Sequence, residues 1–121
     1  MNEQTAVAVV VEDEWLLRLE VVDALNELGW KVVDLATGEQ ARWWLEQGGQ
    51  ASLLVTDIRL PGQLMGWDVA EEFRSRFPGI IVVYCSANPP VKERQVPSSF
   101  FFSKPIRMET VMGACGSPQT R

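Results

Sequence analysis

Residues 53–62 read Leu53-Leu54-Val55-Thr56-Asp57-Ile58-Arg59-Leu60-Pro61-Gly62, and this stretch decides the predicted fold. Its apolar first half fits a central parallel strand buried on both faces, and the Pro61-Gly62 pair forces the chain to turn. Asp57 is therefore expected at the carboxyl end of a buried strand, the edge where open α/β sheets bind ligands. An aspartate that only caps the following loop is the alternative. The other strands of the chain decide between the two.

Further strands and helices alternate on both sides of this stretch. Strands are predicted at 6–11, 31–35, 80–84 and 100–102, and helices at 14–28, 37–48, 66–77 and 107–114. Charged Lys31 and Asp34 place the second strand at a sheet edge. The Thr37-to-Gln40 spacing is typical of a capping box. The alternation predicts an α/β fold, a doubly wound five-stranded parallel sheet of order 2-1-3-4-5 with right-handed crossovers.

The segment 87–99 breaks this alternation. Pro89, Pro90 and Pro97 leave only residues 91–95 free to form a helix, which is less than about one and a half turns. We therefore expect a shortened or missing fourth helix. Phe100 and Phe102 would then lie on a poorly covered edge strand, either as a dimer or partner surface or under a rearranged loop.

Composition limits the class of protein. The 121 residues predict one domain over 1–121, with a core at about 6–115 and a short disordered tail beyond Gly116. A net charge of −5 without a basic cluster argues against nucleic acid and anionic membranes as partners. The absence of a signal-peptide pattern and of a membrane-spanning run predicts a cytoplasmic protein. Without histidine or metal-ligand spacing, the two cysteines are predicted to be reduced thiols, with Cys85 buried.

Polar residues follow four of the predicted strands directly. They are Glu12 and Asp13, Asp57, Ser86 and Lys104. In strand order 2-1-3-4-5 the first and third strands are neighbours, so the acids should repel one another by about 4 kcal/mol at ~4 Å and need a positive partner. Lys104 supplies one charge, and an oxygen-only cluster suits Mg²⁺. With a hydroxyl beside it, this arrangement favours a phosphoryl group on the central carboxylate.

These motifs resemble the receiver domain of two-component response regulators over about Val7 to Val111. The matching motifs are Glu12-Asp13, Asp57 with Leu60-Pro61-Gly62, Ser86-Ala87 and Lys104-Pro105. The resemblance implies a flavodoxin-like fold, with Asp57 as phospho-acceptor. It implies Mg²⁺ bound by Asp13, Asp57, the backbone carbonyl of Arg59 and, through water, Glu12. It also implies that Ser86 and Lys104 contact the phosphoryl group and that the Lys104-Pro105 bond is a candidate for cis.

Three further positions match variable or switching positions of the family. Phe101 corresponds to the aromatic switch residue, with a plain core residue as the alternative. Arg59 and Asn88 correspond to positions that influence the lifetime of the phosphoryl group. Arg59 would shield that group or pair with Glu12, and a solvated surface arginine is the alternative. The cysteine at 85 and Trp30, Trp44 and Trp67 are assigned to the core.

The resemblance implies a receiver phosphorylated by a sensor histidine kinase or phosphotransfer protein, with only slow autodephosphorylation as its own activity. Nothing after Arg107 is long enough for an effector domain, so an unknown downstream protein would read the signal, with the receiver a monomer or weak homodimer. One rival is a pseudo-receiver that never carries phosphate. Another is a Mg²⁺-dependent phosphohydrolase, which would need an acid where this chain has Arg59.

Overall fold

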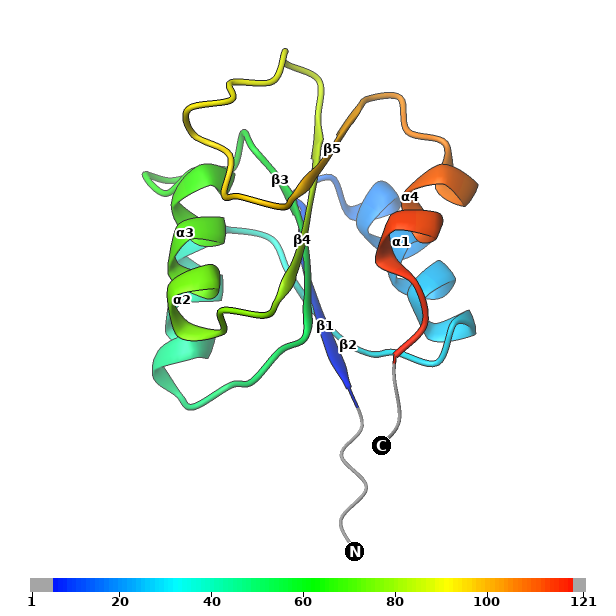
Figure 1. Ribbon diagram of the computed structural model, residues 1–121, viewed down its shortest axis with the longest axis horizontal. Coiled ribbons are helices and arrows are strands. Elements are labelled where there is room, and N and C mark those ends of the chain that lie inside the picture. Colours follow the sequence, from blue (N-terminus) through cyan, green and yellow to red (C-terminus); the bar gives the residue numbers. More distant parts are fainter. Residues whose placement is uncertain (1–5, 119–121) are drawn as a thin grey trace, which may run out of the picture.

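The computed structural model describes residues 6–118 as a three-layer α/β sandwich (Figure 1). Its sheet contains β1 (Val7–Val11), β2 (Lys31–Leu35), β3 (Leu53–Asp57), β4 (Ile81–Ser86) and β5 (Phe100–Ser103). Its helices are α1 (Trp15–Glu27), α2 (Gly38–Glu46), α3 (Gly66–Arg76) and α4 (Met108–Cys115). All strand pairs are parallel, and the order β2-β1-β3-β4-β5 confirms the predicted sheet.

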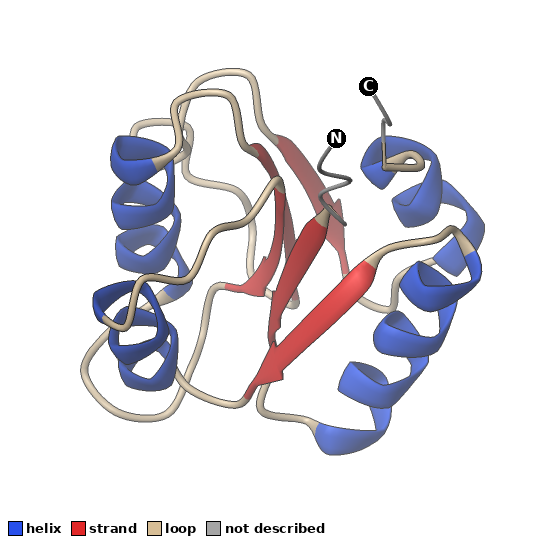
Figure 2. Cartoon of the chain, turned by 90° about the horizontal axis from the view of Figure 1, so that it is seen from below, coloured by secondary structure: helices blue, strands red, loops and turns tan. Residues whose placement is uncertain are grey.

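Two apolar clusters fill the space on the two faces of this sheet. One cluster lies between the sheet and helices α2 and α3, and Tyr84 and Phe73 are its largest fully buried members. The other lies between the sheet and helices α1 and α4, around Leu25 and Val111. Figure 2 shows the two helix layers on opposite sides of the strands. The central strand β3 contributes to both clusters and is buried along its whole length, as its continuous apolar run predicts.

The predicted end of α1 and the predicted start of α2 are both present, but the capping box at the start of α2 differs from the prediction. Gly29 follows α1 with a φ of 101°, a left-handed conformation that glycine adopts without strain. The Thr37 hydroxyl accepts a hydrogen bond from Gln40 N, as predicted. The Gln40 side chain, however, accepts from Ala36 N rather than from Thr37 N, so the expected reciprocal capping box is only half formed.

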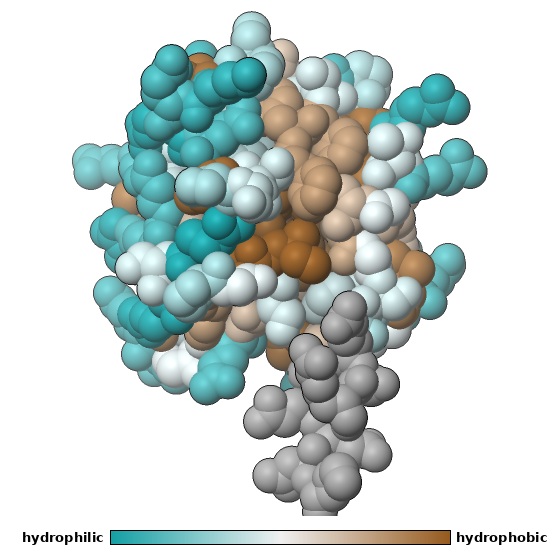
Figure 3. Space-filling model, in the orientation of Figure 1, coloured by the Kyte–Doolittle hydropathy of each residue, from teal (hydrophilic) through white to brown (hydrophobic). Residues whose placement is uncertain are grey.

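The segment between β4 and β5, residues 87–99, contains no helix and is called the β4–β5 loop below. The missing fourth helix is therefore confirmed. Figure 1 shows the loop leaving β4, passing over the first turns of α3 and returning to β5. β5 forms one edge of the sheet, opposite the β2 edge, and its Phe100 is 45% exposed. Figure 3 shows apolar surface gathered over this region of the molecule.

The buried positions of Cys85, Trp30 and Trp67 confirm their assignment to the core, and Trp44 packs against it half-buried. Both cysteines are free, but Cys115 is buried as well as Cys85, because α4 turns it into the same apolar cluster. Burial raises the pKa of each thiol to about 12, which keeps both protonated.

The predicted disordered tail concerns residues that lie in part outside the description, which ends at residue 118. Before that point, the Trp30 indole donates a hydrogen bond to the carbonyl of Gly116 and so connects the end of α4 to the start of β2. Between residues 6 and 118, no helix combines the length and apolarity needed to cross a membrane.

Candidate functional site

Four strands deliver polar side chains to one edge of the sheet. β1 is followed by Glu12 and Asp13, β3 ends at Asp57, β4 ends at Ser86, and β5 is followed directly by Lys104. Asp57 is in register with Cys85, and Ser86 with Ser103, so the ends of β3, β4 and β5 lie next to each other. The expected convergence at the carboxyl ends of parallel strands is therefore present.

Three carboxylates meet at the switch between β1 and β3. Glu12, Asp13 and Asp57 each offer an oxygen atom, and the three oxygens lie within 4.8 Å of one another. Glu12 and Asp57 are only 4% and 7% exposed, while Asp13 is exposed. Oxygen ligands that remain open on the solvent side fit Mg²⁺, which binds one or two carboxylates and keeps several waters.

Lys104 bridges the two buried carboxylates. Its Nζ donates to Glu12 Oε1 and to Asp57 Oδ2, each at 2.9 Å. Burial by itself would lower the pKa of Lys104, but the hydrogen bonds and the charges of Asp57 and Glu12 raise that pKa above its ordinary value. Lys104 therefore remains a cation and offsets part of the repulsion between the acids.

Glu12 is held in a less favourable environment for its charge. Burial raises the pKa of its carboxyl, and the hydrogen bonds from Lys104 and Glu14 N offset this only in part. The nearby Asp57 raises the same pKa further. Burial and the charge of Asp57 therefore make the ionised form of Glu12 less favourable, and a cation bound to the cluster would stabilise that form.

The backbone around Asp57 is fixed from two sides. Asp57 Oδ1 accepts a hydrogen bond from Ile58 N at 2.6 Å, and Gly66 N donates to the Ile58 carbonyl at 2.8 Å. A Cβ atom on Gly66 would lie 1.9 Å from the Asp57 carbonyl oxygen. Only glycine permits α3 to begin this close to the end of β3, and the sequence analysis did not identify this requirement.

Arg18 is a second residue that the sequence did not reveal. Its guanidinium donates to the Glu12 carbonyl at 2.7 Å and to Asp34 at 3.2 Å. It thereby fixes the acidic loop against α1 and the end of β2. On the sequence it is one of several charged residues on a helix, and nothing in the pattern distinguishes it from a solvated one.

Ser86 follows Cys85, the register partner of Asp57, and Phe101 lies on β5 in register with Tyr84. The Ser86 hydroxyl is fully buried and accepts a hydrogen bond from Asn88 N at 3.0 Å. Phe101 is half-buried and its ring lies 6.3 Å from that of Tyr84. The Lys104-Pro105 bond is cis, as the resemblance suggested.

The two modulating positions differ in what they contact. Arg59 is exposed, and within residues 6–118 it forms no ion pair with Glu12, whose partner is Lys104. Asn88 is half-buried and reaches Ser86 through its backbone amide rather than its side chain.

An apolar and acidic surface flanks the site along α1. Trp15, Leu16 and Leu19 are large exposed hydrophobic residues on this helix. A groove runs between α1 and the segment after β5. It is lined by Leu16, Leu17, Ile106 and Met108 and by the acids Glu14, Glu20, Asp23 and Glu27, with Lys104 and Pro105 at the site.

Comparison with known families and proteins agrees with this geometry. Residues 8–115 match the family described as "Response regulator receiver domain". A curated relative, the sensor kinase CckA of Brucella abortus (strain 2308), is 31% identical over 83 residues, which make up 68% of this chain. The match covers only 9% of that kinase.

Solved structures share the fold closely. A response regulator receiver protein from Sinorhizobium medicae WSM419 is 27% identical with a TM-score of 0.86, covering 92% of this chain and 91% of that chain. The receiver domain from the hybrid histidine kinase CckA is 26% identical with a TM-score of 0.75, covering 91% and 95%. A CheY-like receiver domain protein from Methanospirillum hungatei JF-1, at 16% identity, has a TM-score of 0.80 and covers 93% and 91%.

Proposed function

This chain belongs to the response regulator receiver domains, and we propose that it is a phosphorylation switch with Asp57 as its acceptor. One observation carries the proposal: a single ammonium group lies 2.9 Å from both buried carboxylates, beside a third carboxylate that completes an oxygen cluster. A module without phosphoryl chemistry has no need to keep these repelling acids together.

The acidic cluster is the proposed Mg²⁺ site. Asp13 and Asp57 would bind the ion with the Arg59 carbonyl, and Glu12 would contact it through water. When bound, Mg²⁺ supplies the positive charge that lets an anionic phosphoryl group approach an anionic acceptor.

The proposed transfer uses Asp57 as the nucleophile. A carboxylate oxygen of Asp57 attacks the phosphorus of a phosphohistidine on the donor, the phosphorus–nitrogen bond breaks, and the histidine leaves with its electron pair. Lys104 already hydrogen-bonds to Asp57 Oδ2 and would neutralise a phosphoryl oxygen. The Ser86 hydroxyl would donate to another once it turns away from Asn88 N.

The proposed donor is a sensor histidine kinase or a phosphotransfer protein, and the similarity to a sensor kinase supports a kinase partnership. The exposed apolar residues of α1 and its groove lie beside Lys104, so a donor docked there would reach Asp57. The acids along the groove favour a donor surface with basic residues. The downstream protein, a cytoplasmic location and a monomeric or weakly dimeric state stay predictions.

Incubation with acetyl phosphate and Mg²⁺, followed by intact-protein mass spectrometry, tests this function. We expect one added phosphoryl group, which is absent without the metal and absent in Asp57→Asn. Asp13→Asn is the matched variant for the metal, and it should require a much higher Mg²⁺ concentration for the same labelling.

Two outcomes would overturn the proposal. If the wild-type protein gains no mass at saturating Mg²⁺, the chain is a pseudo-receiver that acts by contact alone. If it instead hydrolyses phosphate esters through many turnovers, it is a phosphohydrolase.

A further inference from the structure

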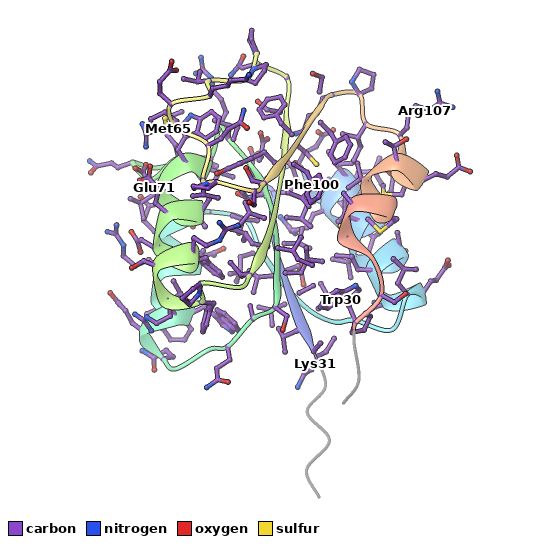
Figure 4. All side chains as sticks on the ribbon, viewed as in Figure 1. Trp30, Lys31, Met65, Glu71, Phe100 and Arg107 are labelled. Atoms are coloured by element: carbon purple, nitrogen blue, oxygen red, sulfur yellow. The ribbon has the colours of Figure 1, made fainter. Side chains whose placement is uncertain are left out.

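The segment between β3 and α3, residues 58–65, is called the β3–α3 loop below. It leads away from Asp57 and contains Arg59, whose backbone carbonyl is a proposed Mg²⁺ ligand. The hydrogen bond from Gly66 N to the Ile58 carbonyl holds the loop at its base. Figure 4 labels Met65 where the loop enters α3, and the Met65 amide donates to Asp68 at 2.9 Å. Both ends of the loop are therefore attached to α3.

Glu39, in the first turn of α2, holds the middle of this loop. Its Oε2 accepts hydrogen bonds from Gln63 N at 2.8 Å and from Leu64 N at 3.1 Å. These bonds, that from Gln63 N foremost, lower the pKa of the Glu39 carboxyl, so the acceptor at neutral pH is the carboxylate. Hydrogen bonds to a charged acceptor are stronger than those between neutral groups. One side chain of α2 thus fixes two successive amides of the loop.

Two glycines allow α2 and the loop to approach this closely. Gly62 has a φ of 90°, and a Cβ atom there would lie 2.6 Å from Glu39 Oε1. Gly38 is buried beside Glu39, and a Cβ atom there would lie 2.7 Å from Leu64 Cβ. Each element therefore contributes a residue without a side chain at the point of contact. The contact depends on both backbones and not on the reach of one flexible side chain.

We propose that Glu39 is a positioning residue for the metal site, which fixes the backbone that carries the Arg59 carbonyl and so raises the affinity for Mg²⁺. This inference rests on the proposed function, in which that carbonyl binds the ion. Glu39 contacts the loop at residues 62–64, beyond Arg59, so it acts through the backbone and not as a ligand. A loop that is already ordered loses less conformational entropy when its carbonyl binds a cation.

Titration with Mg²⁺, followed by the NMR shifts of backbone amides, measures this affinity in the wild-type protein, Glu39→Ala and Glu39→Gln. Glu39→Ala removes both hydrogen bonds, and we expect it to bind Mg²⁺ about tenfold more weakly, as is common when a group that orients a metal ligand is lost. Glu39→Gln keeps an oxygen that can accept from both amides and loses only the charge. It should bind Mg²⁺ nearly as tightly as the wild-type protein.

Amide exchange in the metal-free proteins tests the contact itself. In Glu39→Ala, the amides of Gln63 and Leu64 should exchange about tenfold faster than in the wild-type protein, because each loses its hydrogen bond. Exchange at both amides should stay slow in Glu39→Gln.

Gly62→Ala tests the same contact from the side of the loop, with every charge retained. The added Cβ atom displaces the Glu39 carboxylate, so Mg²⁺ binding should weaken as in Glu39→Ala. Gly48→Ala is the matched control, because Gly48 also has a φ of 90°. Apart from the chain neighbours of Gly48, no atom among residues 6–118 lies within 4 Å of its Cβ position. The backbone strain is therefore similar, and Mg²⁺ affinity should not change.

The outcomes separate this inference from the proposed function. Equal Mg²⁺ affinity of Glu39→Ala or Gly62→Ala and the wild-type protein overturns the positioning role. Binding by Glu39→Gln as weak as that by Glu39→Ala also overturns it, because Glu39 would then act through its charge alone. If the wild-type protein neither binds Mg²⁺ nor accepts a phosphoryl group from acetyl phosphate, the proposed function fails. Amide exchange in the metal-free proteins still decides whether Glu39 holds the loop.

Discussion

The site at the strand ends and the β4–β5 loop adjoin each other at Ser86, and they are held together in different ways. The site beyond the strand ends depends on charge: a cation between two buried carboxylates, with a third acid beside them. The β4–β5 loop depends on neutral hydroxyls at its ends, those of Ser86 and Tyr84, and on one buried valine. It also depends on Arg74 of α3 and on the loop's own Arg94, which pairs with acids of α3. Chemistry therefore concentrates where like charges are forced together, and order in the loop comes from contacts spread over many residues.

The two regions should also differ in what a substitution does to them. Removal of one charged partner in the site leaves another charge buried, so a single change acts on both stability and reactivity. Removal of one contact in the loop leaves the others in place, so a single change should loosen it without affecting Asp57. The following predictions test this difference.

The largest effect is expected at Gly66, where α3 begins against the end of β3. A Cβ atom in Gly66→Ala would lie 1.9 Å from the Asp57 carbonyl oxygen, so α3 or β3 must move. We expect a loss of about 3 kcal/mol or more in the free energy of unfolding by urea, because backbone cannot yield as a side chain can. Phosphorylation of Asp57 should slow as well.

Gly113→Ala is the matched control for this substitution. Among residues 6–118, and apart from the chain neighbours of Gly113 and the nearby backbone of its own helix, no atom lies within 4 Å of the Cβ position at Gly113, which is exposed within α4. Alanine there should stabilise the protein by about 0.5–1 kcal/mol through its higher helix propensity. Equal stability of Gly66→Ala and the wild-type protein would show that the close approach of α3 to Asp57 carries no strain.

A smaller loss is expected from removal of the site cation. Lys104→Met leaves Glu12 and Asp57 buried without their partner, and we expect a loss of roughly 2–3 kcal/mol, below the full value for a buried pair because Lys104 is partly exposed. Mg²⁺ should restore more stability to this variant than to the wild-type protein, because it supplies the missing positive charge. Urea unfolding with and without Mg²⁺ measures both.

Addition of Asp57→Asn to Lys104→Met provides the control. It removes the repulsion between the carboxylates, so the loss caused by Lys104→Met should shrink in this background. If the loss is the same in both backgrounds, the lysine contributes by its aliphatic chain and not by its charge.

The sequence predicted the charged region better than the loop, for a physical reason. The ends of parallel strands share one edge, so strand order and register alone bring Glu12, Asp13, Asp57, Ser86 and Lys104 together. The contacts of Gly66, Arg18 and Tyr84 depend on how helices and loops approach one another in space. Periodicity carries no signal for such contacts, since a glycine, a helical arginine and a buried tyrosine all have ordinary roles.

For the β4–β5 loop, the sequence predicted the absence of a helix but not the path of the chain. Three prolines predicted correctly that no full helix forms between β4 and β5. They did not predict where the chain goes instead, because that path is set by the burial of the loop residue Val96, by the hydrogen bond from Arg74 of α3 and by the ion pair of the loop residue Arg94 with Asp68.

A loop contact should cost less than either site change. Arg74→Lys keeps the charge, but an ammonium cannot reach the carbonyls of Pro97 and Ile80 together as the planar guanidinium does. We expect a loss of about 1–2 kcal/mol in urea unfolding and faster amide exchange in the half of the loop next to β5. The rate of Asp57 phosphorylation should remain that of the wild-type protein. A slower rate would show that the loop and the site are not separable.

The smallest effect is expected from a change of pH. The sign of the resulting change in the free energy of unfolding distinguishes Glu12 of the charged site from an exposed surface carboxylate. Burial raises the pKa of Glu12, so the folded state binds this proton more readily than the unfolded chain does. The free energy of unfolding contributed by Glu12 should therefore increase as the pH falls from the raised pKa toward the ordinary glutamate pKa of 4.5, and stay constant below it. Without Mg²⁺, the wild-type protein should gain stability relative to Glu12→Gln over this interval.

Glu39 is the matched control with the opposite sign. Hydrogen bonds from Gln63 N and Leu64 N lower the pKa of its carboxyl. The stability that Glu39 contributes is therefore present above the ordinary glutamate pKa of 4.5 and is lost as the pH falls through the lowered pKa. The wild-type protein should therefore lose stability relative to Glu39→Gln in that lower range. Equal pH dependence of the wild-type protein and Glu12→Gln would mean that Lys104 fully compensates the Glu12 charge. The acidic cluster would then have no need of a bound cation.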